Sequence, residues 1–281
     1  MTHLLLPIRM HFMMDKVCKK ALKASFTVFL ALAACYANAQ KQPVLIAHRG
    51  GVVDSSYTEN GMAALREAAT AGYKMVETDM RVTKDGVLVV NHDADLKRYY
   101  GLDKKVADLE WQEIRKLKSR LDGSTPLRLE DVLRFCHEQH MGVMLDNKIP
   151  GLDTMLFNQV LGLLDQYHLL DTALMIGTDE STGFFTGKIK LSCSRRQLEE
   201  NMRKPGYNAA HYFLFERPAN LSREDIEWAS NHRITAVAAI NKYHYRQSAD
   251  MLKDAANDCR RMLDLGVENF QIDSEFEKFL K

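Results

Sequence analysis

Two histidines lie in short polar segments that directly follow apolar runs of the chain. His48 is followed by Arg49 and two glycines, and His92 lies between Asn91 and Asp93. An imidazole gains or loses a proton near neutral pH, so a pair of them can supply the acid and the base of one reaction. A guanidinium binds a phosphate through two parallel hydrogen bonds, and glycines let the backbone approach a ligand closely. Taken alone, the His-Arg-Gly triplet is equally compatible with a structural role.

Acidic residues accompany these histidines. Glu77 and Asp79 are two positions apart in the apolar run 75–82, so their side chains point to the same side of a strand. Two carboxylates on one face repel each other unless a cation lies between them, and hard cations such as Ca²⁺ or Mg²⁺ prefer oxygen ligands. The alternative is a pair of solvated charges, which fits poorly in so apolar a strand. Asp146 and Lys148 follow a later apolar run and complete a set of residues that suits a phosphate and a metal ion.

The elements that must position these residues alternate along the chain, with short β-branched runs between longer segments of helical period. Strands are expected at residues 44–47, 75–82, 142–146, 173–177, 189–193, 211–215, 234–240 and 270–272. Helices are expected at residues 59–71, 128–140, 152–166, 194–202, 223–231 and 248–265. Eight strands fit a closed (β/α)8 TIM barrel, an α/β fold whose catalytic residues lie at the C-terminal ends of the strands. Residues 40–281 are therefore expected to form one barrel domain.

One irregularity interrupts this alternation. Residues 87–90 form a further apolar run, joined to the second strand through Lys84-Asp85-Gly86, which is typical of a tight turn. We interpret this run as a short hairpin addition and not as a ninth barrel strand. Residues 94–126 then form a small insertion between the second and third barrel strands, with its own helix around residues 109–117. We expect this insertion to cap one side of the site.

The order and spacing of these motifs resemble the amino-terminal signature of the glycerophosphodiester phosphodiesterase family. The resemblance lies in Ala47-His48-Arg49-Gly50, Glu59-Asn60, Glu77-Thr78-Asp79, Thr83-Lys84-Asp85-Gly86 and Asn91-His92-Asp93. The insertion and the segment 126–133 resemble the insertion of that family and the helix before its third strand. The match covers residues 48–148, and the combined pattern is highly specific.

The resemblance implies a role for each matching residue. It assigns His48 and His92 as the acid and base pair, Glu77, Asp79 and Asp146 as ligands of one divalent cation (Ca²⁺ or Mg²⁺), Arg49 and Lys148 as the groups that neutralise the phosphate, and Glu59 as the partner that orients Arg49 or the metal site. The implied reaction is metal-dependent hydrolysis of a small-molecule phosphodiester, a glycerophosphodiester, to an alcohol and a phosphomonoester.

Two other functions are weighed against this one. A hydroxyl next to the phosphoester can attack first and give a cyclic phosphate, so a lyase-like cyclising phosphodiesterase acting on a lipid or glycan phosphodiester is the first alternative. The second is a surface barrel that binds phosphorylated glycans or lipids without turnover. The intact pair of His48 and His92 argues against a binding-only protein.

The sequence also departs from the family pattern. Asp146-Asn147-Lys148 stands where the family usually has Glu-x-Lys, and an Asp there also resembles the related sphingomyelinase D group. Near the end of the chain, Ala239-Ile240-Asn241 and Gln271-Ile272-Asp273 differ from the usual Trp-Thr-x-Asn and Thr-Asp elements. The first half of the chain therefore predicts the reaction, whereas the identity of the alcohol on either side of the phosphate stays open. Loop residues 216–217 and 243–245 are candidates for the alcohol pocket, with ordinary exposed loop positions as the alternative.

The charge balance limits the classes of partner. The 281 residues carry 38 basic and 37 acidic side chains, a formal net charge of +1, so no overall field draws the protein toward nucleic acid.

Three cysteines follow residue 40 without the spacing of a zinc site or a disulfide framework, and we expect them to be buried as small hydrophobic residues: Cys136, Cys193 and Cys259.

The first 39 residues have a different character. A lysine-rich stretch at residues 16–23 precedes an apolar run at residues 26–34 and then small residues, which predicts a secretory signal peptide. Two processing sites are open, namely cleavage after Ala39 and a bacterial lipoprotein box with a lipid anchor at Cys35. No later stretch approaches the roughly 20 apolar residues of a transmembrane helix, so none is expected in the mature protein. We expect an exported protein, periplasmic or a membrane-anchored lipoprotein in a bacterium.

Overall fold

The computed structural model describes residues 42–51 and 55–281 of the chain. The chain divides into two units, Met1–Gln42 and Pro43–Lys281, and every element below belongs to the second. The predicted signal peptide, the cleavage site after Ala39 and the anchor at Cys35 lie outside the described residues. In the described part of the chain, no helix has the length and the apolar character needed to span a bilayer.

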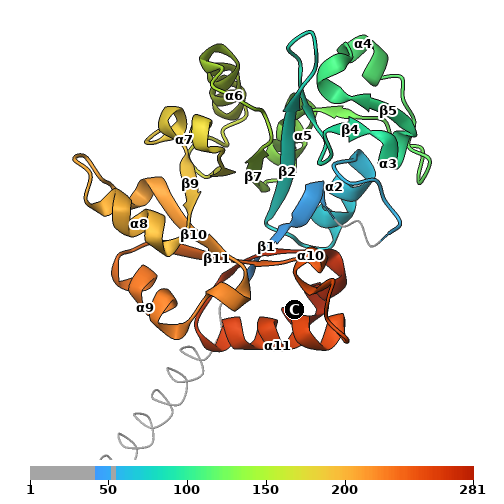
Figure 1. Ribbon diagram of the computed structural model, residues 1–281. Coiled ribbons are helices and arrows are strands. Elements are labelled where there is room, and N and C mark those ends of the chain that lie inside the picture. Colours follow the sequence, from blue (N-terminus) through green and yellow to red (C-terminus); the bar gives the residue numbers. More distant parts are fainter. Residues whose placement is uncertain (1–41, 52–54) are drawn as a thin grey trace, which may run out of the picture. The chain divides into compact units, whose positions relative to one another are not determined.

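Eight parallel strands close into a barrel (Figure 1). They are β1 (Val44–Ala47), β2 (Met75–Val82), β7 (Gly142–Asn147), β8 (Leu174–Ile176), β9 (Lys190–Cys193), β10 (Tyr212–Glu216), β11 (Thr235–Ile240) and β12 (Asn269–Ile272). Each strand pairs with the next in this order, and β1 pairs in parallel with both β12 and β2, which closes the ring. The predicted (β/α)8 TIM barrel is confirmed, with strand boundaries within a residue or two of those expected.

Helices connect the strands on the outside of the barrel. They are α2 (Met62–Thr70), α5 (Leu129–Glu138), α6 (Thr154–Gln166), α7 (Asp179–Phe185), α8 (Arg195–Met202), α9 (Arg223–Asn231), α10 (Lys242–Tyr245) and α11 (Met251–Asp264). The six predicted helices are all present. The seven-residue α7 was not predicted, because so short a segment carries too little periodicity to stand out. Its start signal is Thr178, whose side chain accepts a hydrogen bond from the Ser181 amide.

The helix predicted at residues 59–71 begins later than expected. Asn60 has a φ of 57°, in the left-handed region, and α2 starts only at Met62. The Asn60 side chain is the physical reason, because its amide oxygen accepts hydrogen bonds from the Thr78 hydroxyl and the Asp79 backbone amide. Glu59 and Asn60 therefore lie in a loop and not on a helix.

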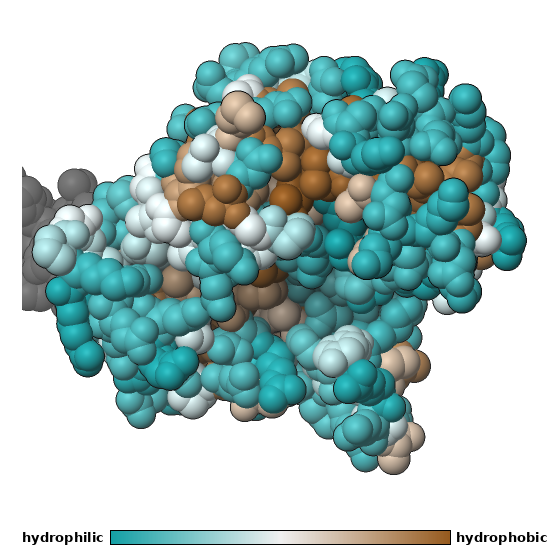
Figure 2. All heavy atoms as spheres, turned by 45° about the horizontal axis from the view of Figure 1, so that its top comes forward, coloured by the Kyte–Doolittle hydropathy of each residue, from teal (hydrophilic) through white to brown (hydrophobic). Residues whose placement is uncertain are grey.

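The hydrophobic core has two layers, as the alternation of side chains along each barrel strand requires. The larger layer lies between strands and helices and contains the three described cysteines, which are free and buried as expected. The smaller layer fills the barrel interior: Ile46, Met144, Leu174, Phe213 and Val237. On the face shown in Figure 2 the surface is mostly hydrophilic, and hydrophobic residues gather beside a hollow near its middle.

The insertion between the second and third barrel strands is built on a hairpin. The last residues of β2 pair antiparallel with β3 (Leu88–Val90), and β3 pairs with β6 (Leu127–Arg128), so residues 87–90 extend the sheet without joining the barrel, as predicted. The rest of the insertion comprises β4 (Asp95–Leu96), α3 (Lys97–Tyr100), β5 (Leu102–Lys105) and α4 (Trp111–Ile114). It has its own small core: Val89, Leu96, Val106, Leu109 and Ile114.

Candidate active site

The first strand of the barrel delivers His48 and Arg49 into a tight turn. Both lie in a three-residue 3-10 segment after β1, where Arg49 has a φ of 55°. Gly50 follows with a φ of 78°, and a side chain there would lie 2.5 Å from the Cα atom of Asn60. Glycine is thus required by this close approach, which brings the Glu59–Asn60 loop against the end of β1. The backbone amide of Asn60 donates to the Arg49 carbonyl over 2.8 Å.

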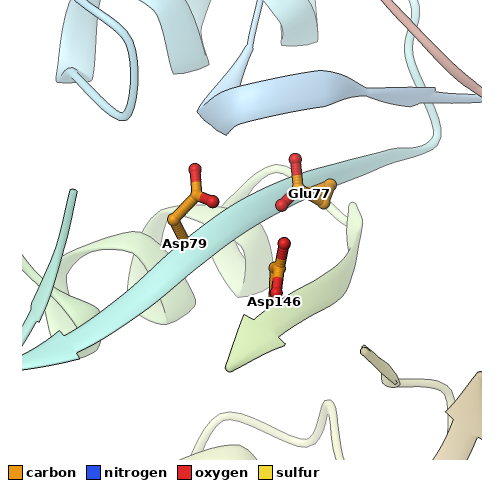
Figure 3. A group of neighbouring side chains, drawn as sticks. All are labelled: Glu77, Asp79 and Asp146. Atoms are coloured by element: carbon orange, nitrogen blue, oxygen red, sulfur yellow. The ribbon is translucent and has the colours of Figure 1, made fainter. Parts of the chain in front are cut away.

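Three carboxylates meet where β2 and β7 run side by side (Figure 3). Ligand atoms of Glu77, Asp79 and Asp146 all lie within 4.8 Å of one another. Glu77 and Asp79 are both 1% exposed. Burial, together with the charge of Asp79, raises the pKa of Glu77 to about 8. Burial also raises the pKa of Asp146, and Lys148 offsets only part of that rise.

This donor set fits a hard divalent cation. All three groups offer oxygen, the ligand that Ca²⁺ and Mg²⁺ prefer, and the raised pKa of Glu77 shows that a second negative charge beside Asp79 is unfavourable here without a cation. The nearest cation is Lys148, whose Nζ atom lies 2.5 Å from Asp146 Oδ2 and 3.8 Å from Asp79 Oδ1. This ammonium group lies at Asp146 and Asp79, and the pKa of Glu77 stays raised in its presence. The structure thus brings together the predicted metal ligands and the predicted phosphate-binding lysine.

His48 is held by a partner from the far end of the chain. Its Nδ1–H donates to Asp273 Oδ1 over 2.6 Å, which turns Nε2 toward the carboxylates, 3.8 Å from Glu77 Oε2. Burial lowers the pKa of His48, but the hydrogen bond to Asp273 and the charges of Glu77 and Asp273 outweigh it, so the pKa is raised above its usual value. His48 is therefore poised to carry a proton on Nε2.

His92 has the opposite arrangement. Its Nδ1–H donates to Asp93 Oδ1 over 2.8 Å, and Arg49 Nη2 lies 3.2 Å from its Nε2. A guanidinium only donates, so the Nε2 of His92 is the acceptor in this contact. Arg81, on the same face of β2 as Glu77 and Asp79, secures the loop by donating to the His92 carbonyl over 2.6 Å. One imidazole is thus set to give a proton and the other to take one.

Glu59 lies against the guanidinium of Arg49. Arg49 Nη1 donates to Glu59 Oε1 over 2.8 Å, while the backbone amide of Arg49 donates to Glu77 Oε2 over 2.7 Å. The Nε atom of Arg49 is buried and has no hydrogen-bond partner among residues 42–51 and 55–281. The guanidinium consequently keeps an unused donor, next to the one that now faces the Nε2 of His92.

Several contributors to the site were missed by sequence reasoning. Asp273 could have been identified from the sequence, because it directly follows the eighth predicted strand and residues at such positions lie at the catalytic face of a barrel. Asn60 lay inside a recognised motif, and its side-chain amide donates to Asp79 Oδ2 over 3.1 Å. Arg98 belongs to the insertion and donates to both Glu59 and Asp93. Nothing in the local sequence marks Arg98 as part of the site.

The second half of the barrel contributes a cavity of about 370 Å³ at the ends of β8, β9 and β10. Its lining includes Gly177, Ser192, Phe215 and Glu216. Gly177 follows Ile176, which pairs with Asp146 in the sheet, so the cavity begins one strand away from the carboxylates. The candidate residue Glu216 is thus one of the residues that line this cavity.

Another alcohol-pocket candidate was wrong. Tyr245 is buried in the core, and its hydroxyl donates to Asp258 Oδ2 over 2.9 Å. The reason is the short helix α10, which turns Tyr245 inward while leaving Tyr243 60% exposed.

Comparisons with known proteins find related sequences. A family model described as the glycerophosphoryl diester phosphodiesterase family matches residues 48–246. Glycerophosphodiester phosphodiesterase 1 of Bos taurus is 43% identical over 111 residues, which cover 37% of this chain and 33% of that relative. The chain spans between 23% and 40% of the length of such curated relatives.

Solved structures share the fold. A glycerophosphoryl diester phosphodiesterase from Parabacteroides distasonis superposes with a TM-score of 0.68 at 20% identity, covering 85% of each chain. A phosphodiesterase from Oleispira antarctica, solved in complex with the product sn-glycerol-3-phosphate, has a TM-score of 0.66 at 18% identity and covers 85% of this chain and 97% of its own. Since the family model extends from His48 past the seventh barrel strand, this chain belongs to the glycerophosphoryl diester phosphodiesterase family.

Proposed function

We propose that this protein hydrolyses glycerophosphodiesters to an alcohol and a phosphomonoester in a reaction that depends on a divalent cation. The observation that carries the proposal is the pair of imidazoles beside the three carboxylates. His48 is arranged to hold a proton on Nε2, and the Nε2 of His92 is arranged to accept one. A phosphodiester needs both functions, because water must lose a proton as it attacks and the departing alkoxide must gain one.

Each residue of the site has its own role in this reaction. Arg49 and Lys148 neutralise the non-bridging oxygens of the phosphate, for which Arg49 has a buried Nε donor that no described residue occupies. His92 takes a proton from the attacking water as the new P–O bond forms, and His48 gives its proton to the leaving oxygen as the old P–O bond breaks. When bound by Glu77, Asp79 and Asp146, the cation supplies positive charge that polarises the phosphoryl oxygens.

The position of the cavity indicates where the alcohol group of the substrate would bind. The cavity at the ends of β8, β9 and β10 lies beside Asp146 and offers hydroxyl, carboxylate and aromatic groups to a polar leaving group. The Oleispira antarctica neighbour was solved with sn-glycerol-3-phosphate as its product, which supports glycerol 3-phosphate as the phosphomonoester released here. We propose Ca²⁺ or Mg²⁺ as the cation, on the basis of the all-oxygen ligand set.

A substrate screen tests the proposal. The purified protein is incubated with glycerophosphodiesters of several alcohols, with Ca²⁺, Mg²⁺ or a chelator present, and the products are identified by mass spectrometry. We expect cation-dependent release of glycerol 3-phosphate. A cyclic glycerol phosphate as the final product would instead favour the cyclising alternative, and phosphate binding without turnover would favour the binding-only one.

We further propose that the protein is exported, which rests on the lysine-rich and apolar segments at residues 16–34. The mass of the protein purified from its native host is the test. Loss of residues 1–39 would support signal cleavage, and an acylated Cys35 at the new terminus would support a lipid anchor. Retention of residues 16–34 would refute export.

A further inference from the structure

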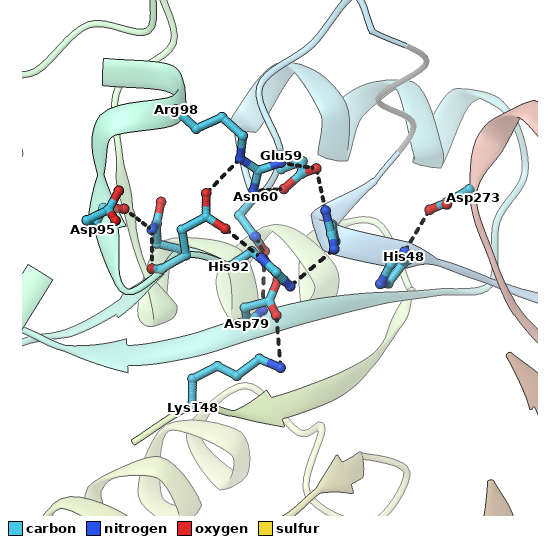
Figure 4. Close-up of polar contacts among 12 residues, drawn as sticks. His48, Glu59, Asn60, Asp79, His92, Asp95, Arg98, Lys148 and Asp273 are labelled. Carbon is cyan, nitrogen blue, oxygen red and sulfur yellow. Dashed lines mark hydrogen bonds and ion pairs between the residues drawn. The ribbon is translucent and has the colours of Figure 1, made fainter. Parts of the chain in front are cut away.

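Arg98, a residue of the insertion and not of the barrel, uses all of its guanidinium nitrogens on site partners (Figure 4). Its Nη1 and Nη2 atoms donate to the two oxygens of Glu59 over 2.8 and 2.6 Å. Its Nε donates to Asp93 Oδ2 over 2.7 Å. A two-pronged contact to one carboxylate together with a third bond to another holds the guanidinium in a single orientation.

Each partner of Arg98 in turn holds one residue of the proposed reaction. Glu59 accepts from Arg49 Nη1 over 2.8 Å, and Asp93 accepts from His92 Nδ1 over 2.8 Å. Arg49 Nη2 and His92 Nε2 are 3.2 Å apart. The five side chains therefore form a closed ring of hydrogen bonds in which Arg98 lies opposite the contact between the phosphate-binding arginine and the proposed base.

The charges of the ring explain why a second arginine is needed. Burial raises the pKa of Glu59, but the hydrogen bond from Arg98 and the charges of both arginines outweigh it, so the pKa lies below its usual value. Because Glu59 is shared between Arg98 and Arg49, Arg49 is only partly neutralised and retains charge for a phosphate. Without Arg98, Glu59 would lose one of its two arginine partners and draw more strongly on Arg49, and Asp93 would lose the donor that fixes its carboxylate against His92.

The loop that carries Glu59 has other anchors. Asp122 of the insertion accepts hydrogen bonds from the Thr58 backbone amide over 2.9 Å and from the Thr58 hydroxyl over 2.6 Å. On the other side, Asn60 is tied to Asp79 and Thr78. A change at Arg98 therefore removes the ring contact while these bonds continue to hold the loop.

We propose that Arg98 is a positioning residue that keeps Arg49 free to bind the phosphate and keeps His92 in the orientation of a base. This inference rests on the proposed phosphodiesterase function. It also gives the insertion a role in the site, because the insertion supplies the guanidinium that bonds to both Glu59 and Asp93. Charge alone does not suffice for this role, since two carboxylates on different segments must be reached at once.

The test compares Arg98→Ala and Arg98→Lys with Lys97→Ala. Lys97 is the matched control, because it is the neighbouring cation on α3 and its ion pair with Asp103 is exposed, with 65% and 73% exposed side chains. The measurements are kcat and KM on a glycerophosphodiester, the affinity for inorganic phosphate by calorimetry, and Tm. We expect both Arg98 variants to lose about 10- to 100-fold in kcat/KM, with lower kcat and weaker phosphate binding, and Lys97→Ala to match the wild type.

A rescue experiment separates positioning from folding. Millimolar methylguanidinium should restore part of the activity of Arg98→Ala, because it can refill the site between the two carboxylates, and should leave Arg98→Lys unchanged. Wild-type kcat/KM and wild-type phosphate affinity in both Arg98 variants would overturn the inference. A loss of kcat/KM in Arg98→Lys that is fully explained by a lower fraction of folded protein would overturn it too. If the wild-type protein turns over no glycerophosphodiester, the proposed function fails instead. In that case, unchanged phosphate affinity in the Arg98 variants would overturn the positioning role as well.

Discussion

The Nδ1 atom of His48 lies 2.6 Å from Oδ1 of Asp273, although the two residues are 225 positions apart. This contact joins the first and last strands of the barrel at the catalytic face. Asp273 is itself fixed, because its other oxygen accepts a hydrogen bond from the Lys242 backbone amide over 2.6 Å. The pair decides which nitrogen of His48 faces the carboxylates, and with it the atom that delivers a proton.

Removal of the Asp273 carboxylate should therefore slow turnover more than it weakens substrate binding. In Asp273→Ala, His48 loses both the partner that orients its ring and a charge that favours its protonated form, so we expect kcat to fall by about 10- to 100-fold with little change in KM. Steady-state kinetics at neutral pH check this, with Glu275→Ala as the control that alters a nearby carboxylate outside the pair. An Asp273→Ala enzyme with wild-type kcat would show that the contact is structural only.

Both imidazoles should be required. His48→Ala and His92→Ala are each expected to lower turnover by about 100-fold or more, because attack and departure need separate proton-transfer groups. His137→Ala is a suitable control, since His137 is exposed near the C-terminal end of α5, which leads to the start of β7 and not to its catalytic end. Circular dichroism should show the same fold in all three variants. Near wild-type activity in either His48→Ala or His92→Ala would disprove the paired acid and base.

The carboxylate cluster should set the metal affinity. Asp146→Asn removes one negative ligand and is expected to weaken binding of Ca²⁺ or Mg²⁺ by about 10- to 100-fold or more, whereas Asp146→Glu keeps the charge and should be tolerated in part. Isothermal titration with each cation measures this directly. If Asp146→Asn bound the cation as tightly as the wild type, Asp146 would be withdrawn as a ligand while Glu77 and Asp79 remained. A fully active protein shown to be metal-free by elemental analysis would exclude the site.

Metal binding should also depend on pH through Glu77. With its pKa raised to about 8, this carboxyl is protonated at neutral pH in the metal-free protein, and a cation must displace the proton. Affinity should therefore rise as pH increases from 6 toward 8 and level off above that value. Calorimetry in two buffers with different ionisation enthalpies should detect proton release at pH 7. The absence of proton release would show that Glu77 is already ionised in the metal-free protein, which would contradict its raised pKa.

The same group predicts how the free energy of unfolding of the metal-free protein varies with pH. Glu77 ionises with a pKa of 4.5 when unfolded and about 8 when folded, so the folded state binds the extra proton between these values. Its stabilising contribution is complete below the unfolded pKa and is lost as pH rises toward 8. Denaturant titrations between pH 5 and 8.5 should show this decline, and Glu77→Gln should flatten it. A wild-type profile as flat as that of the variant would contradict the raised pKa.

Local patterns in the sequence determined much of this molecule. The alternation of apolar runs and helical segments predicted eight strands, and the two-residue period of a strand placed Glu77 and Asp79 on one face, where the structure has them. The Lys84-Asp85-Gly86 turn predicted that residues 87–90 leave the barrel, which the antiparallel pairing of β3 with β2 confirms. These predictions succeed because strand period, turn chemistry and strand-end position depend on residues close together in the chain.

Tertiary structure alone decided which side chains complete the site. Asp273 reaches His48 only because the barrel closes, and Arg98 reaches Glu59, 39 positions away, only because the insertion folds back over the first loop. The start of α2 was likewise decided from a distance, because Asn60 gives up helical geometry to bind Thr78 and Asp79. The physical reason is the same in each case. Such a hydrogen bond joins groups that the chain separates widely, so its presence depends on strand register and loop packing, which no local pattern specifies.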